Sequence, residues 1–171
     1  MNMASLKKAL NNVAGLVLAG VLAAIIGTSG IASAMGEHGH KAGDLVIGEA
    51  KIRATVGLMN ATGGYVTITN NGKSDDRLIS VSAPFAKMSE IHTMENDDGV
   101  MKMRPMPNGA VIPAGGRLML EPGGKHMMFM GVNDALAPDS EYSLTLTFAN
   151  AGKVVINAIV KRPGDLHAGH N

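Results

Sequence analysis

The sequence has 171 residues, a length that suits one domain with a hydrophobic core better than two. Its 15 Lys and Arg nearly balance its 14 Asp and Glu, and it has three Phe, two Tyr and no Trp. This composition provides neither a basic stripe nor an aromatic platform for nucleic acid. Cysteine is absent. Disulfide frameworks, blue-copper electron carriers, thiol oxidoreductases and Cys₄ zinc modules are therefore excluded, because each of them depends on cysteine sulfur.

Residues 1–34 have the pattern of a secretory signal peptide. Lys7 and Lys8 form a basic start, residues 13–26 are strongly apolar, and Ala32-Ser33-Ala34 supplies a small-x-small end. The apolar run is shorter than the roughly 20 residues that span a bilayer, so we expect cleavage after Ala34 rather than retention as an anchor. No later segment is apolar enough to cross a membrane. The sequence therefore predicts a protein exported to the periplasm, without a membrane span after cleavage.

The rest of the chain alternates between short apolar segments and turns rich in Gly, Pro and Asn. The clearest alternation places Tyr142, Leu144, Leu146 and Phe148 on one face, and Asn70-Asn71-Gly72 is a hairpin-type turn signal. No helical period persists for three turns. This pattern predicts an all-β sandwich or Greek-key barrel. The expected strands include 65–69, 77–81, 111–112, 117–120, 142–148 and 154–160.

One domain, 43–161, is expected between two small, polar segments. Residues 35–42 and 162–171 are predicted to be flexible. These two segments contain four of the six histidines, namely His38, His40, His167 and His170.

The other two histidines lie among the methionines. Nine of the 13 methionines fall between Met88 and Met130. Asp98-Gly99 is a strong two-residue hairpin signal; if it forms the turn, Met94 lies opposite Met103. His92 then becomes the diagonal neighbour of Met103 on the same face.

A second cluster is His126-Met127-Met128-Phe129-Met130. Because side chains alternate along a strand, His126, Met128 and Met130 share one face, while Met127 and Phe129 share the other. Thioether sulfur favours Cu(I) and imidazole suits copper. A neutral set of two histidines and two methionines therefore predicts copper transport or storage rather than redox cycling. The alternative is that methionine simply fills the core of an aromatic-poor protein.

These residues resemble the signature of the periplasmic copper chaperones called PCu(A)C. The family pattern is a histidine, a methionine 11 positions later, and a His-x-Met about 23 positions after that; His92, Met103, His126 and Met128 match it. Sequence segments similar to those of the family also occur at residues 90–94, 99–105, 112–116, 121–128 and 144–148. The resemblance extends over roughly 43–160. One departure is the absence of the Pro-Trp that family members commonly carry before the segment at 50–55.

The resemblance implies a cupredoxin-like β-barrel that holds Cu(I) through His92, Met103, His126 and Met128. The additional methionines leave the choice of sulfur ligands open, and Met94 is the first candidate for a substitute, because of its predicted position opposite Met103. These additional methionines are Met94, Met101, Met106, Met127 and Met130. It also implies delivery of copper to the dinuclear centre of cytochrome c oxidase. The expected partners are then copper and an acceptor, either an oxidase subunit or another copper chaperone. Some members bind an additional copper, often Cu(II), in a terminal extension. His167 and His170, with His38 and His40, are the candidates for that site, and solvated tails without metal are the alternative.

The leading hypothesis is a periplasmic Cu(I) chaperone that is not an enzyme. The sequence contains no Gly-x-Ser-x-Gly, no His-Glu-x-x-His and no phosphate loop. A copper-sequestering resistance protein without a dedicated acceptor, and a structural β-sandwich without metal, remain as alternatives. A redox enzyme comes last, because the cysteine that usually tunes such a copper site is missing.

Overall fold

The computed structural model describes residues 39–57 and 59–167. The predicted signal peptide, His38 and His170 lie outside the described residues. The described part of the chain is almost entirely β-structure, and it contains no helix long and apolar enough to cross a membrane. In chain order its elements are β1 (His40–Ala42), β2 (Leu45–Ile47), β3 (Ala50–Arg53), β4 (Ala61–Asn70), β5 (Asp76–Ser82), β6 (Ala86–Asp97), β7 (Val100–Pro105), β8 (Ala110–Ile112), β9 (Arg117–Leu120), β10 (His126–Val132), β11 (Glu141–Phe148), β12 (Lys153–Lys161) and the 3₁₀ helix η1 (Pro163–His167).

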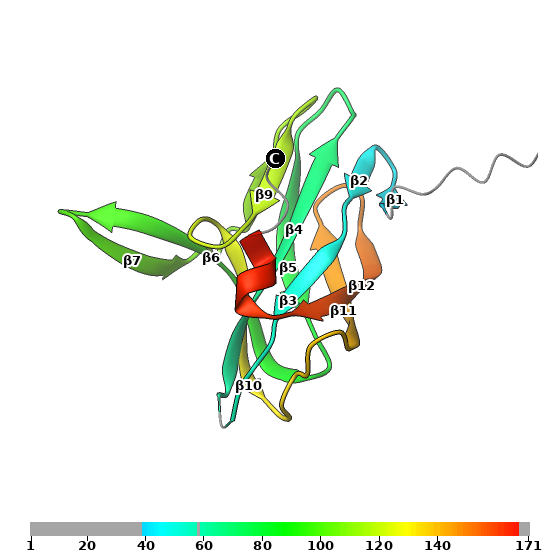
Figure 1. Ribbon diagram of the computed structural model, residues 1–171. Coiled ribbons are helices and arrows are strands. Elements are labelled where there is room, and N and C mark those ends of the chain that lie inside the picture. The colour runs from blue at the N-terminus through cyan, green and yellow to red at the C-terminus, as the bar shows by residue number, and fades with distance from the viewer. Residues whose placement is uncertain (1–38, 58, 168–171) are drawn as a thin grey trace, which may run out of the picture. The chain divides into compact units, whose positions relative to one another are not determined.

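The strands pair in the order β7-β6-β10-β4-β3-β12-β11-β5-β8, with β2 and β9 also pairing with β4, and β1 with β2 (Figure 1). Neighbours such as β4 and β10 are far apart in the sequence, so several connections cross over instead of forming hairpins. β3 and β12 are parallel. The prediction of an all-β sandwich is confirmed. The β6–β7 hairpin projects away from the other strands as an arm (Figure 1).

Aliphatic side chains from alternating strand positions fill the interior. Phe85 contacts Phe129 and Tyr142 edge-on, with ring centroids 5.1 Å apart in both pairs. Burial of apolar area at about 25 cal/mol per Å² stabilises this core, which has no disulfide to support it. The largest fully buried side chains are Leu45, Ile47, Ile52, Ile68, Leu78, Ile112, Met127, Phe129, Leu136, Leu144, Leu146 and Ile156.

Strand β10 is held against the core by its inward-facing residues. Met127 and Phe129 are both 0 % exposed. They pack over Gly64 of β4, where a Cβ atom would come within 2.6 Å of the Phe129 ring and 3.1 Å of the Met127 methyl group. Because side chains alternate along a strand, this anchoring fixes His126 and Met128 on the outer face of the sheet.

The turn after β4 is not the hairpin that the sequence indicates. β4 and β5 do not pair with each other; β5 pairs with β8 and β11. Asn70 is only 2 % exposed, and its side-chain amide donates to the carbonyls of Ser74 (2.9 Å) and Ile112 (3.1 Å). Its oxygen accepts the N–H of Gly72 (2.9 Å). The hairpin prediction is wrong because these bonds tie the turn to β8 and direct the chain across the sandwich.

The segments expected to be flexible contain regular structure next to the domain. His40–Ala42 forms β1, which pairs with β2 so that His40 lies opposite Ile47. Pro163–His167 forms η1 after the last strand. Backbone pairing in a local hairpin orders β1 without burying polar side chains, which is why small, polar composition does not reveal it.

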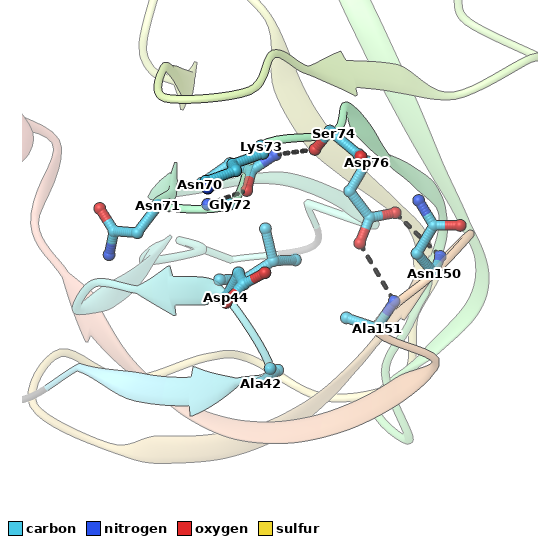
Figure 2. A pocket seen from close by; sticks show the side chains of 12 residues that line it. Ala42, Asp44, Asn70, Asn71, Gly72, Lys73, Ser74, Asp76, Asn150 and Ala151 are labelled. Carbon is cyan, nitrogen blue, oxygen red and sulfur yellow. Dashed lines mark hydrogen bonds between the residues drawn. The ribbon is translucent and has the colours of Figure 1, made fainter.

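Replacing Asp76 with alanine is expected to lower the free energy of unfolding by about 2–4 kcal/mol, because three donors lose a charged acceptor. The buried carboxylate accepts backbone N–H bonds from Arg77 (2.7 Å), Asn150 (2.9 Å) and Ala151 (3.1 Å), beside a cavity of about 720 Å³ (Figure 2). Urea denaturation measures the change. Asp75→Ala is the control, since that exposed group accepts one backbone bond, from Ala114. Equal losses in the two variants would contradict the assigned role of Asp76.

Candidate metal centre

The pairing of β6 with β10 brings the two histidines of the methionine-rich region directly opposite each other. His126, the first residue of β10, pairs with His92 of β6. Their ring centroids are 5.9 Å apart and the ring planes are inclined by 56°. A metal ion lies about 2 Å from an imidazole nitrogen and therefore about 3 Å from the ring centroid. One ion can consequently contact both rings at the observed separation.

The outer face of β10 carries the first thioether. Met128 is two residues beyond His126 and points to the same side of the sheet, while Met127 and Phe129 point into the core. The predicted division of this cluster between two faces is confirmed. Met128 is half-buried and lies opposite Glu90 of β6.

The β6–β7 hairpin supplies the second thioether. Asp98 and Gly99 both have positive φ angles, 51° and 84°, as a two-residue type I′ turn requires. Met94 pairs with Met103, and His92 pairs with Pro105, so that His92 is the diagonal neighbour of Met103. The predicted register is therefore confirmed.

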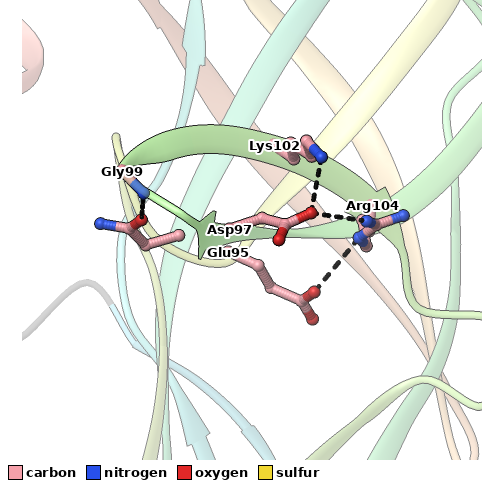
Figure 3. A network of polar contacts seen from close by, with 6 residues as sticks. Glu95, Asp97, Gly99, Lys102 and Arg104 are labelled. Carbon is pink, nitrogen blue, oxygen red and sulfur yellow. Dashed lines mark hydrogen bonds and ion pairs between the residues drawn. The ribbon is translucent and has the colours of Figure 1, made fainter.

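Strand β7 is exposed along its whole length. On one face of the arm, charged side chains pair across the strands: Lys102 with Asp97 (2.5 Å), and Arg104 with both Glu95 (3.3 Å) and Asp97 (3.7 Å) (Figure 3). The other face carries Met103, which is 47 % exposed. The arm therefore separates its charged residues from its methionines.

Hydrogen bonds orient both imidazoles. Nε2 of His92 lies 2.7 Å from Oε2 of Glu90, and because a carboxylate only accepts, Nε2 carries the proton. Nδ1 of His92 is buried, and among the described residues it has no hydrogen-bond partner. Nδ1 of His126 donates to the carbonyl of Gly124 (3.0 Å), which leaves Nε2 as its acceptor. Metal-binding histidines in proteins are held in this way by a partner of the other ring nitrogen.

The chemistry of these donors fits a soft ion. Among the described residues, no group of three or more His, Cys, Asp or Glu is placed to hold a metal. A centre at the histidine pair therefore needs methionine sulfur in addition, and Met103 and Met128 lie on the same face of the sheet. Thioether and imidazole ligands without a thiolate favour Cu(I).

The other histidines considered for copper lie in β1, in η1 or outside the described ranges. His40 is exposed in β1. His167 ends η1, and His170 is outside the described residues. Sequence reasoning missed Glu90 as the partner of His92. The signal was available, because residues i and i+2 of a strand share a face.

Solved structures of PCuAC domains have the same fold as the described chain. The apo PCuAC domain from PmoF1 is 25 % identical, covers 74 % of this chain and 100 % of its own, and gives a TM-score of 0.63. The Cu(I) form of DR1885 from Deinococcus radiodurans is 27 % identical, with 67 % and 76 % covered and a TM-score of 0.57. A copper-bound PCuAC domain from PmoF2, 23 % identical with a TM-score of 0.63, covers 74 % and 99 % and supports the fold alone. The cupredoxin-like β-sandwich that the sequence predicts is confirmed.

The sequence comparisons lead to a family described as lipoproteins. "Putative lipoprotein Lxx21020" of Leifsonia xyli subsp. xyli is 28 % identical over 123 residues, which are 72 % of this chain and 73 % of that protein. The 171 residues contain no cysteine, so none of them can carry a thioether-linked lipid. The likeness to PCuAC domains is a likeness of fold, as the solved structures show. The family model "Putative lipoprotein LpqE-like" matches residues 45–160, and the chain belongs to this LpqE-like family.

Proposed function

We propose that this protein is an exported Cu(I) chaperone that holds one ion through His92, His126, Met103 and Met128. The observation that carries the proposal is the histidine pair, with ring centroids 5.9 Å apart and a buried Nδ1 of His92 that has no hydrogen-bond partner among the described residues. A buried polar atom without a partner is costly in a folded protein. Coordination of a metal ion by this lone pair removes that cost.

Copper in the reduced state suits this set of ligands better than other ions. Carboxylates and water would favour harder ions, whereas two thioethers and two neutral imidazoles favour Cu(I). The Cu(I) form of DR1885, which is 27 % identical, has the same fold, and this likeness supports the same metal here. It does not assign the ligands, which are inferred from the registers of β6, β7 and β10.

The accessibility of the site favours delivery of copper over catalysis. Met103 is 47 % exposed at the edge of the sheet, so an incoming ligand of an acceptor can reach the metal from that side. Stepwise exchange of weak, neutral ligands then moves the ion without a change in oxidation state. We propose the dinuclear copper centre of cytochrome c oxidase as the destination, in line with the resemblance to PCu(A)C chaperones. The basic start, the apolar run and the small-x-small end of residues 1–34, with the lipoprotein names of the relatives, support export.

A competition titration with a chromogenic Cu(I) chelator under reducing conditions tests this function. We expect one tight equivalent of Cu(I), retained when the chain is truncated after Lys161, because the four ligands all lie before that residue. A Cu(II) equivalent found in a separate titration without reductant, and lost on truncation, would assign the additional copper to His167 and His170. Tight Cu(I) binding that disappears with the truncation would move the site to the tail and favour sequestration. No competitive binding in the full-length protein would contradict the copper function.

A further inference from the structure

The face of the sheet that carries the two histidines carries methionines on both sides of them. Along β6 the cross-strand pairs are Met88 with Met130, Glu90 with Met128, and His92 with His126. The same face continues onto the arm, where Met94 pairs with Met103 and Asn96 with Met101. Because direct partners in an antiparallel pair share a face, these side chains form one continuous outer row.

The methionines of the arm do not serve a hydrophobic core. Met101 is 52 % exposed and Met103 is 47 % exposed. The opposite face of the arm consists largely of paired charges, which do not form a core either (Figure 3). Exposed apolar side chains gathered on one surface generally mark an interaction site. The use of methionine as a core filler therefore does not explain Met101 and Met103.

We infer that Met94, Met101 and Met103 form a second, weaker site for soft monovalent ions, which acquires Cu(I) and passes it to the histidine pair. The inference rests on the proposed function for its second step. Directly opposite residues such as Met94 and Met103 have Cβ atoms about 5 Å apart, and diagonal ones such as Met94 and Met101 about 7–8 Å apart, within reach of long side chains. This face of the arm holds no carboxylate between Met94 and the turn. Its amide oxygen, that of Asn96, accepts the N–H of Gly99, so hard ions find no charged ligand there.

Met103 connects the two sites. It is opposite Met94 and diagonal to His92, so its sulfur belongs to both sets of ligands. Transfer is then a ligand exchange in which Met103 stays bound. The thioethers of Met94 and Met101 are replaced by the imidazoles of His92 and His126 and the thioether of Met128. The ion remains Cu(I), and all the ligands are neutral, so no electron or proton has to be supplied.

The test compares the wild-type protein with the variant Met94→Leu/Met101→Leu, in which leucine keeps the apolar character but removes sulfur. Stopped-flow transfer of Cu(I) from a chromogenic chelate reports acquisition, and equilibrium competition reports the tight site. We expect transfer to slow at least tenfold in the variant, while the affinity of the tight equivalent changes by less than threefold. The control Met59→Leu/Met119→Leu removes two exposed methionines outside β6, β7 and β10 and should behave as wild type.

A second readout makes the acquisition site visible without the tight site. In His92→Ala/His126→Ala protein with ¹³C-labelled methionine methyl groups, titration with Ag(I) should shift the signals of Met94, Met101 and Met103. Unchanged signals, or unchanged transfer in the Met94→Leu/Met101→Leu variant, would overturn the inference. Loss of the tight equivalent in that variant would also overturn it, by placing these sulfurs in the primary site. Failure of the proposed function is seen separately, as the absence of a tight equivalent in wild-type protein.

Discussion

Replacing both His92 and His126 with alanine is expected to lower the Cu(I) affinity by about a thousandfold or more, which corresponds to about 4 kcal/mol of binding free energy. The double variant removes both imidazole donors and leaves only thioethers, which bind through weaker neutral sulfur. The loss should appear in competition with a chromogenic Cu(I) chelator under reducing conditions. Both side chains are buried, with 9 % and 6 % exposed, but they lie on the face of the sheet opposite the core residues Met127 and Phe129 of β10, which are unchanged. We therefore expect the variant to fold, with an unaltered circular dichroism spectrum.

His40→Ala is the matched control, because His40 is an exposed strand residue outside β6 and β10. It should leave the Cu(I) affinity unchanged. Glu90→Gln tests the orientation of the His92 ring. Since the partner of a ligating imidazole typically contributes about 10–100-fold to metal affinity, this variant should lie between wild type and the double variant. Wild-type affinity in the double variant would show that the copper is bound elsewhere.

The parts of this site that were predictable from the sequence are those fixed by neighbouring residues. The turn at Asp98-Gly99 determines the register of its own hairpin, and with it the opposition of Met94 and Met103. Strand alternation places His126 and Met128 together. Each of these inferences uses backbone geometry over a few residues, and therefore no knowledge of the rest of the fold.

The pairing of His92 with His126 could not be derived in the same way. It depends on the register between β6 and β10, which are joined through β7, β8, β9 and their loops. β10 is also held against β4 by the packing of Met127 and Phe129 over Gly64, so its position depends on contacts between distant parts of the chain. The spacing pattern suggested that the histidines converge. Only the fold gives the ring separation and shows that Nδ1 of His92 has no hydrogen-bond partner among residues 39–57 and 59–167.

The turn at Asn70 shows why local signals can mislead. Asn-Gly is typical of tight hairpins when the flanking strands pair. Here the buried side chain of Asn70 has a stronger set of partners in Ser74, Ile112 and Gly72. The hydrogen bond from Asn70 to Ile112 of β8 therefore determines the direction of the chain after β4. Ile112 lies 42 positions further along the sequence.

A glycine between β7 and β8 is expected to be among the least replaceable residues of the domain. Gly109 has a φ of 70°, and a Cβ atom there would lie 2.1 Å from the carbonyl oxygen of Leu78 and 3.0 Å from the Cα of Ile79. These are backbone atoms of β5, which cannot rotate away. Gly109→Ala should lower the free energy of unfolding by about 3 kcal/mol or more, combining a left-handed backbone with a steric clash. Urea denaturation measures the change.

Gly115→Ala separates the two causes, because Gly115 has a similar φ of 64°, but a Cβ atom there would meet no other atom within 4 Å. Only the backbone term applies there, and it amounts to about 1 kcal/mol. The difference between the two variants is then the cost of the clash. The loop at Gly109 is also hydrogen-bonded to β6, because the N–H of Met106 donates to the carbonyl of Ile91 (2.7 Å). Displacement of this loop therefore strains β6, the strand that carries His92. Equal losses in the two variants would mean that β5 yields to the added methyl group, and that the close approach of Gly109 to Leu78 does not hold this end of the arm in place.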